Sequence, residues 1–172
     1  MKKIEDYGFG RVVSWFSCGA ASACAAKLAI QKYGTMVTVV YCDTMKTEHP
    51  DTARFFGEVE KWLGVKIEKI KSEKFEDVDE VFEKTRYMSG IKGARCTTEM
   101  KKVPRFEFQN YDDLHIFGLC ADEEKRIRLF ENNNPELLLD WNLREAGFKK
   151  DDCYQLLRQE GIKLPLMYSL GF

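Results

Sequence analysis

The sequence lacks long apolar runs and any large excess of charge. None of its apolar segments reaches the roughly 18 residues that a membrane-spanning helix requires, so we expect no contact with a membrane. Residues 1–6 lack the apolar region of a signal peptide, which predicts a cytoplasmic protein. A formal net charge of −1 argues against a general nucleic-acid-binding surface. The length of 172 residues and the hydrophobic content of 44% predict one soluble domain spanning residues 1–172.

Metal-binding patterns of cysteine and histidine are also missing. No C-x-x-C pair occurs, and no cysteine lies at zinc-finger spacing from a histidine. The two histidines are not predicted to be ligands, because His49 falls in a loop without partners and His115 falls inside a strand. We therefore expect reduced thiols, several of them buried as small apolar side chains. The six cysteines are Cys18, Cys24, Cys42, Cys96, Cys120 and Cys153.

Strand-like and helix-like segments alternate along the chain. Short apolar and β-branched runs predict strands at 11–16, 38–42, 65–70 and 114–118. Helices are predicted at 21–32, 50–63, 77–85, part of 97–109 with Pro104 limiting it, 123–131, and 151–160 with Asp151 as the N-cap. Residues 86–94 are predicted to form a loop. This alternation indicates right-handed crossovers and a mostly parallel sheet covered on both faces.

Three clusters of small or polar residues directly follow predicted strands. They are 17–22, the pair Asp43 and Thr44, and 118–126. The carboxyl ends of parallel strands meet at one edge, where ligands bind at the point of strand-order reversal. We therefore expect a single site at this edge. Asp43 could hold Mg²⁺ or a ribose hydroxyl there, or it could simply cap the next turn.

The segment 17–22 joins a strand to a helix through small residues only. Small side chains let backbone N–H groups approach an anion, and the helix N-terminus adds a favourable partial charge. The segment has neither the G-K-[ST] ending of a Walker A loop nor a G-x-G-x-x-G turn. It predicts a phosphate-binding loop, and a tight turn without a ligand is the alternative.

A cationic stretch between residues 86 and 105 contains only one acid, Glu99. Such a concentration of positive charge in a nearly neutral protein indicates an anionic substrate, and a solvated helix face is the alternative. Cys96, in basic surroundings, is a candidate nucleophile or metal ligand, although a single cysteine is more often a buried inert thiol. Arg126 and Arg128 could pair with acids on their own helix. The cations of the stretch are Arg86, Lys92, Arg95, Lys101, Lys102 and Arg105.

Five segments, in order along the chain, resemble the PP-loop ATP pyrophosphatase superfamily, also described as adenine nucleotide alpha-hydrolase-like. Within it, they are most similar to the phosphoadenosine phosphosulfate (PAPS) reductase group and to the small subunit of bacterial ATP sulfurylase. The segments are 16–22 (like S-G-G-x-D-S), 43–52 (like D-T-G-x-x-x-P-E-T), 95–104 (like the family's cysteine, lysine and proline segment), 118–126 (like G-x-R-x-D-E-E-K-x-R) and 165–172 (like a segment near the family's C-terminus).

The resemblance implies a three-layer α/β/α sandwich with a mostly parallel sheet of about five strands. It also implies an enzyme that cleaves ATP to AMP and pyrophosphate while activating an unknown acceptor, with Mg²⁺ held at Asp43. Arg95, Lys101 and Arg126 would hold the leaving group or a substrate sulfate or phosphate, and Cys96 is the candidate nucleophile. The residues expected to contact the nucleotide are Ser17, Cys18, Gly19, Ala20, Ala21, Ser22, Cys42, Asp43, Thr44 and Gly118.

Two other functions are compatible with the resemblance. One is a PAPS reductase-like protein that binds a sulfonucleotide and takes its thiol from elsewhere, and the other is a nucleotide-binding module without turnover. The second is favoured by Ala21, which stands where the family's loop has Asp. A macromolecular acceptor would require a partner chain or a homo-oligomer.

Further departures from the family pattern are Cys18 and Met45 in place of Gly and Cys120 in place of Arg. The E-C-G-x-H tail and the paired iron–sulfur cysteines of related reductases are also missing, so self-contained reduction is not expected.

Overall fold

The centre of the fold is a five-stranded parallel sheet with strand order β3-β2-β1-β6-β7. It is seen in a computed structural model that describes residues 8–91 and 93–171. The strands are β1 (Arg11–Trp15), β2 (Val37–Cys42), β3 (Ile67–Ile70), β6 (Asp113–Phe117) and β7 (Leu138–Asp140). The predicted parallel sheet is therefore confirmed, and β7 is a strand that the sequence pattern had not indicated.

The order of strands reverses direction between β1 and β6. From β1 the chain steps outward to β2 and β3, and it later returns to pair β6 against the opposite side of β1. Trp15, the last residue of β1, pairs with Val40 on one side and with Phe117 on the other. The carboxyl ends of β1 and β6 therefore lie side by side at the switch point, where parallel sheets open a crevice for ligands.

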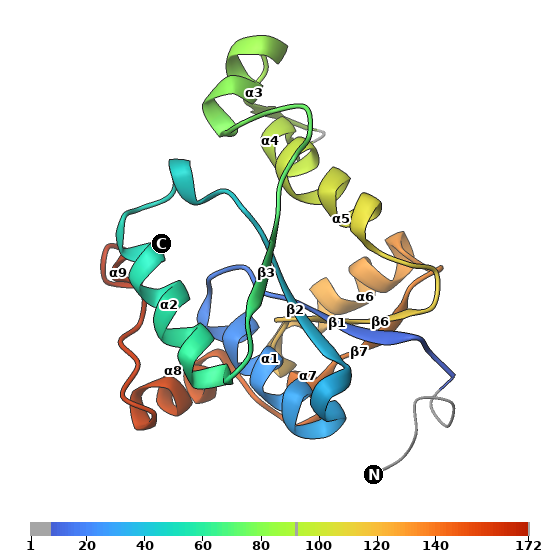
Figure 1. The fold of residues 1–172 in the computed structure, drawn as a ribbon, viewed down its shortest axis with the longest axis vertical. Coiled ribbons are helices and arrows are strands. Elements are labelled where there is room, and N and C mark those ends of the chain that lie inside the picture. The colour runs from blue at the N-terminus through green and yellow to red at the C-terminus, as the bar shows by residue number, and fades with distance from the viewer. Residues whose placement is uncertain (1–7, 92, 172) are drawn as a thin grey trace.

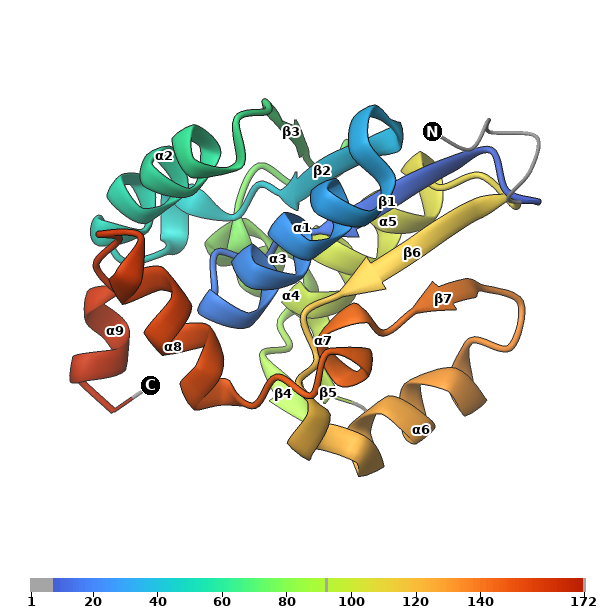
Figure 2. The ribbon, with the colours of Figure 1, turned by 90° about the horizontal axis from the view of Figure 1, so that it is seen from below.

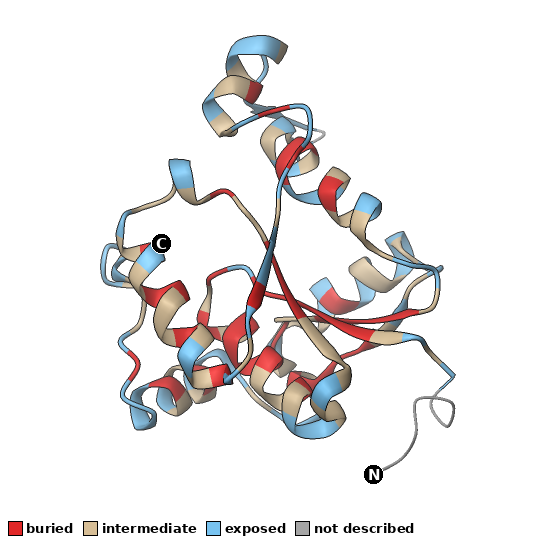
Figure 3. Ribbon diagram, viewed as in Figure 1, coloured by how far each residue is buried: buried red, intermediate tan, exposed pale blue. Residues whose placement is uncertain are grey.

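Helices cover both faces of the sheet, which confirms the three-layer α/β/α sandwich (Figures 1 and 2). One face packs against α1, α2, α7 and α8, and the other packs against α5 and α6. These helices are α1 (Ala20–Tyr33), α2 (Asp51–Leu63), α5 (Val103–Phe108), α6 (Glu124–Asn133), α7 (Asn142–Glu145) and α8 (Lys150–Gln159). Figure 3 shows buried residues concentrated in the sheet and in α1.

Successive side chains of β1 point to opposite faces of the sheet and contribute to different apolar clusters. Val12 belongs to the large cluster under α1, whereas Val13 and Trp15 point to the opposite face, together with Val40. The buried side of α1 consists only of Ala, Ser and Cys, so this helix can approach the sheet closely. The face that carries Trp15 has a much smaller buried cluster, and this leaves room for a cavity there.

The segment after α3 (Val78–Thr85) differs most from the prediction. A small hairpin of β4 (Ser89–Gly90) and β5 (Gly93–Ala94) replaces part of the expected loop. It is followed by α4 (Arg95–Thr97), the π-helical turn η4 (Thr98–Lys102) and α5, which together run through Pro104. The expectation that Pro104 limits this helix was wrong. Inside a helix, a proline ring clashes with the carbonyl oxygen of the residue four positions earlier. The wider π-helical turn before Pro104 leaves space for the ring.

Two smaller findings concern helix ends. The N-cap of α8 is Lys149, two residues before the predicted Asp151. The N–H of Lys149 donates to Asp152 Oδ2 at 2.8 Å. No helix within residues 8–91 and 93–171 is long and apolar enough to cross a bilayer. The remaining short turns are η2 (Gly34–Met36), η3 (Met45–Thr47), η5 (Ala121–Glu123) and α9 (Leu166–Ser169).

Candidate functional site

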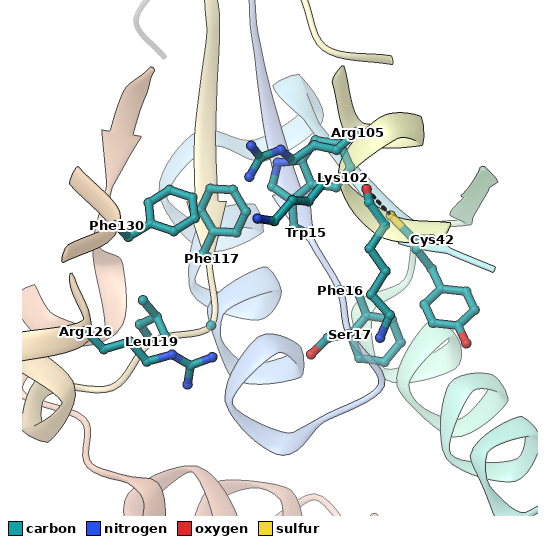
Figure 4. Close-up of a pocket in the computed structure, with 13 residues that line it drawn as sticks. Trp15, Phe16, Ser17, Cys42, Lys102, Arg105, Phe117, Leu119, Arg126 and Phe130 are labelled. Carbon is teal, nitrogen blue, oxygen red and sulfur yellow. Dashed lines mark hydrogen bonds between the residues drawn. The ribbon is translucent and has the colours of Figure 1, made fainter. Parts of the chain in front are cut away.

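A cavity of about 270 Å³ lies at the switch point between β1 and β6, and we call it the switch-point cavity (Figure 4). Elements from both halves of the sheet contribute to it, together with η4, α5 and α6. Its lining residues are Trp15, Phe16, Ser17, Tyr41, Cys42, Lys101, Lys102, Arg105, Phe117, Gly118, Leu119, Arg126 and Phe130.

Aromatic rings form one wall of this cavity. Phe117 and Phe130 lie side by side with ring centroids 4.6 Å apart, and Trp15 stacks on Phe117 at 6.3 Å with planes only 15° apart. The indole Nε1–H of Trp15 donates to Nδ1 of the buried His115 at 3.1 Å, which fixes the orientation of the ring. Such a wall suits a planar, apolar group such as a nucleobase.

Four cations face the aromatic wall from three elements. Lys101 and Lys102 come from η4, Arg105 from α5 and Arg126 from α6. The Arg105 guanidinium lies 5.8 Å from the ring centroid of Phe117. Among the described residues, neither Lys101, Lys102 nor Arg105 pairs with a carboxylate, and no Asp or Glu lines the cavity. This excess of positive charge gives the cavity the electrostatics of an anion site.

The predicted phosphate loop is organised around the hydroxyl of Ser22. Ser22 Oγ accepts from the N–H groups of Ser17 at 3.0 Å and Gly19 at 3.4 Å, and it donates to the Gly19 carbonyl at 2.9 Å. Cys18 has a φ of 55°, in the left-handed region that favours glycine. This explains why the family's loop has Gly at the position of Cys18. Burial, with a smaller contribution from the charge of Glu48, raises the pKa of the Cys18 thiol to about 12.

Gly118, a predicted nucleotide contact, has a clear role in backbone packing. A Cβ at this position would lie 2.5 Å from both the N and Cα atoms of Ser22. The end of β6 therefore presses directly against the first turn of α1, and only glycine permits that approach. The same contact brings Gly118 and the loop to one corner of the switch-point cavity, because Ser17 and Gly118 both line it.

The N–H of Ala20, at the start of α1, is occupied by a residue from the far end of the chain. It donates to Oη of Tyr168 in α9, at 3.1 Å. The resemblance had indicated the segment around Tyr168 without giving that residue a role. Since 148 residues separate the two partners, no local pattern could have predicted the contact.

Cys42 is the last residue of β2, and Asp43 and Thr44 follow it. Cys42 lines the cavity, and burial raises the pKa of its thiol to about 11. Asp43 Oδ1 accepts from the N–H of Met45 at 3.1 Å, and Oδ2 lies 3.7 Å from Lys69 Nζ. Thr44 is buried, and its hydroxyl donates to Glu48.

These contacts do not fit Mg²⁺ at Asp43. One carboxylate oxygen is engaged by a backbone donor and the other by a cation. Within residues 8–91 and 93–171, no three Asp, Glu, His or Cys side chains gather as a metal site. Mg²⁺ prefers several oxygen ligands in a regular octahedron. The metal role of Asp43 therefore stays a prediction without structural support.

The four residues predicted to be catalytic are not all brought together. Lys101 and Arg126 line the switch-point cavity, but Arg95 and Cys96 do not. Arg95 Nη2 pairs with Glu99 Oε1 at 2.6 Å, and the half-buried Cys96 packs on the apolar cluster around Met100. Lys101 and Cys96 lie on different sides of the same helical segment. One side of this segment faces α3, and the other faces the cavity.

Several lining residues were missed by the sequence reasoning. Lys102 and Arg105 were noted only as part of the cationic stretch, although Arg105 lies four residues after Lys101 and three after Lys102, spacings that make helical residues neighbours. Trp15 and Phe117 end adjacent strands, and this position was the available signal for them. Phe130 lies four residues after Arg126, one helical turn along α6.

A parallel sheet with a strand-to-helix loop of small residues and a cationic cavity at its switch point is the arrangement typical of nucleotide-binding α/β domains. Comparison of the sequence with models of known protein families identifies the family within this class. Residues 11–137 match the model of the phosphoadenosine phosphosulfate reductase domain, and the chain belongs to that family, within the PP-loop adenine nucleotide alpha-hydrolase-like superfamily. The family binds adenine nucleotides and sulfonucleotides. Among curated proteins, no sequence matches the chain.

Proposed function

We propose that the switch-point cavity binds an adenine sulfonucleotide, such as PAPS or adenylyl sulfate. The observation that carries this proposal is the composition of the cavity, which combines an aromatic wall with four cations and no carboxylate among its described lining residues. Cations without carboxylates neutralise a phosphate and sulfate chain directly, whereas a nucleoside triphosphate bound with Mg²⁺ calls for acidic ligands. Membership of the PAPS reductase domain family supports the same ligand class.

In the proposed arrangement, each part of the ligand meets a matching part of the cavity. The adenine lies against Trp15 and Phe117, and the phosphates extend toward the first turn of α1. The sulfate or terminal phosphate lies near Lys101 and Arg126, in the roles that the family resemblance implied for them. This orientation follows from chemistry, because the aromatic wall is apolar and the cations carry charge-assisted hydrogen-bond donors.

The proposed function is binding, with any reducing thiol supplied from elsewhere. Reduction of a sulfonucleotide needs a thiolate, and Cys42 is the one cysteine among the described cavity-lining residues. With a pKa of about 11, its thiol is protonated at neutral pH and is a poor nucleophile. Cleavage of ATP to AMP and pyrophosphate is the second candidate, since the Ser17 and Ser22 hydroxyls and the α1 N-terminus form a loop of the PP-loop type.

A thermal-shift panel separates the candidates. The ligands are PAPS, adenylyl sulfate, ATP, AMP and GTP, each with Mg²⁺ and with EDTA. A ligand at about a hundred times its Kd adds about 2.7 kcal/mol, or roughly 5 to 11 °C for a chain of this size. We expect the sulfonucleotides to stabilise the protein equally with Mg²⁺ and with EDTA. Stabilisation by ATP only with Mg²⁺ would support the second candidate, and no shift with any ligand would refute both.

Arg126 and Arg128 provide a matched pair for testing the site. Both are exposed arginines of α6 that pair with a nearby glutamate, Arg126 with Glu123 of η5 at 2.7 Å and Arg128 with Glu124 of α6 at 2.9 Å. Only Arg126 lines the cavity. We expect Arg126→Ala to weaken sulfonucleotide binding by about tenfold, the value of a lost charge-assisted hydrogen bond, and Arg128→Ala to leave it unchanged. Titration calorimetry measures both, and equal effects would contradict the assignment.

A further inference from the structure

The hydroxyl of Tyr168 contacts the backbone of the predicted phosphate loop at Ala20, the first residue of α1. Its Oη accepts from Ala20 N–H at 3.1 Å, one of the N–H groups that a helix leaves unsatisfied at its start. A Cβ at Gly19 would lie 3.2 Å from the same hydroxyl, which is closer than an ordinary contact. Glycine at this position therefore leaves the space that the Tyr168 hydroxyl uses.

The proton of the Tyr168 hydroxyl is available to a ligand. The hydroxyl accepts from Ala20, but no acceptor for its own proton occurs among the described residues. Burial raises the pKa of Tyr168, so the group keeps its proton at neutral pH. A hydroxyl that accepts from a helix N-terminus is polarised by the helix dipole, which makes it a stronger donor.

The tyrosine is held in place by contacts on two sides. Its ring packs on Tyr154, with centroids 5.4 Å apart. The start of α9 is tied to α2, because Leu166 N–H donates to Asp51 Oδ2 at 2.8 Å and Arg54 Nη2 donates to the Leu164 carbonyl at 3.2 Å. The position of the hydroxyl is therefore set by packing and by an ion-paired anchor, as expected of a group that positions a ligand.

We propose that Tyr168, which lies beside the loop and outside the lining of the switch-point cavity, donates its hydroxyl proton to a phosphate oxygen bound at the loop. The Tyr168 hydroxyl accepts from the Ala20 N–H and would take its place as the hydrogen-bond donor to the phosphate. This inference rests on the proposed function, because it assumes that the loop receives the phosphates of the nucleotide. It predicts a residue that distinguishes phosphorylated ligands from their uncharged counterparts.

The test compares Tyr168→Phe with Tyr154→Phe in titrations of PAPS and adenosine. Both substitutions remove one hydroxyl from the same pair of rings, but Tyr154 makes no hydrogen bond to the loop among the described contacts. We expect Tyr168→Phe to weaken PAPS binding by about tenfold and to leave adenosine binding unchanged, since adenosine has no phosphate to accept the proton. We expect Tyr154→Phe to match the wild type with both ligands.

Several results would overturn the inference. Unchanged PAPS binding by Tyr168→Phe would show that the hydroxyl contributes nothing, and tighter binding would show that it competes with the phosphate for Ala20. An equal loss for PAPS and adenosine would reveal a purely structural role. A wild-type protein that binds neither ligand would refute the proposed function itself, whereas wild-type binding with an unaffected variant would refute only the role of Tyr168.

Discussion

Gly118, at the end of β6, shows how a single residue can set the geometry of the whole site. A methyl group added there would lie 2.5 Å from the Ser22 backbone, which cannot yield as a flexible side chain can. We expect Gly118→Ala to destabilise the protein by about 1–3 kcal/mol, the usual cost of overpacking. It should also weaken sulfonucleotide binding, because the first turn of α1 must move away from β6. Urea denaturation and titration calorimetry measure the two effects.

Gly57 is the matched control for this substitution. It lies within α2, and a Cβ there would meet no atom within 4 Å. We expect Gly57→Ala to stabilise the protein by about 0.5–1 kcal/mol, because alanine loses less conformational entropy in a helix. If the two substitutions changed the free energy of unfolding in the same direction, the close approach of β6 to α1 would not be the reason for Gly118.

At the scale of elements, the C-terminal segment depends on an ion pair in the first turn of α2. Asp51 and Arg54 pair at 2.6 Å and together hold the backbone of residues 163–166. We expect Asp51→Ala to speed amide exchange at Leu166 by on the order of tenfold, since a charge-assisted acceptor is lost. Hydrogen exchange followed by mass spectrometry measures this change, which should extend to the peptide containing Tyr168.

Glu58→Ala is the control for Asp51→Ala. Glu58 also pairs with Arg54, at 2.7 Å, but makes no bond to residues 163–166. Its loss should leave exchange at Leu166 unchanged. Arg54 holds the pKa of Asp51 at about 2, below the usual 3.8. Because this pKa is depressed in the folded state, the anchor is complete above about pH 4 and is lost as pH falls toward 2. Unchanged exchange in Asp51→Ala would disprove the anchor.

Local signals made most of the elements predictable. The runs behind β1, β2 and β6 are apolar and β-branched, and the ends of α1 and α2 carry Gly34 and Gly64. β7 was missed because it has only three residues, and its pairing with β6 creates a strand that the sequence pattern does not contain. The π-helical turn η4, which joins α4 to α5, was not predicted because its wider hydrogen-bond spacing depends on tertiary packing. No residue periodicity specifies such a turn in advance.

At the scale of the molecule, the site was predictable as a place but only partly as a set of residues. The loop could be found from sequence, since its small residues are contiguous and follow a strand. The aromatic wall joins Trp15, Phe117 and Phe130, which are far apart in sequence and meet only because β1 and β6 pair. Nothing in the sequence distinguished Arg95 from Lys101 within the cationic stretch. In the folded helix, only Lys101 lines the cavity. Tyr168 reaches the loop through tertiary packing alone.

A buried histidine should make the stability of the whole molecule depend on pH. His115 lies in the middle of the sheet, is 1% exposed, and accepts from Trp15 Nε1. Burial lowers its pKa from 6.5 to about 4. Between these values the unfolded chain binds the proton and the folded chain does not, so this contribution is complete above about pH 6.5 and is lost progressively as pH falls toward 4.

The loss amounts to about 2 kcal/mol at pH 5 and approaches about 3 kcal/mol near pH 4. Urea denaturation of the wild type at pH 7.5, 6, 5 and 4.5 should show this decline, and His115→Asn, which keeps an acceptor but cannot be charged, should remove most of it. His49→Asn is the control, since His49 lies in a loop and accepts from Asp51 N–H. An unaltered decline in His115→Asn, or its disappearance in His49→Asn, would mean that another group carries it. The result bears on binding as well, because a proton on His115 Nδ1 would remove the acceptor that orients Trp15 in the cavity wall.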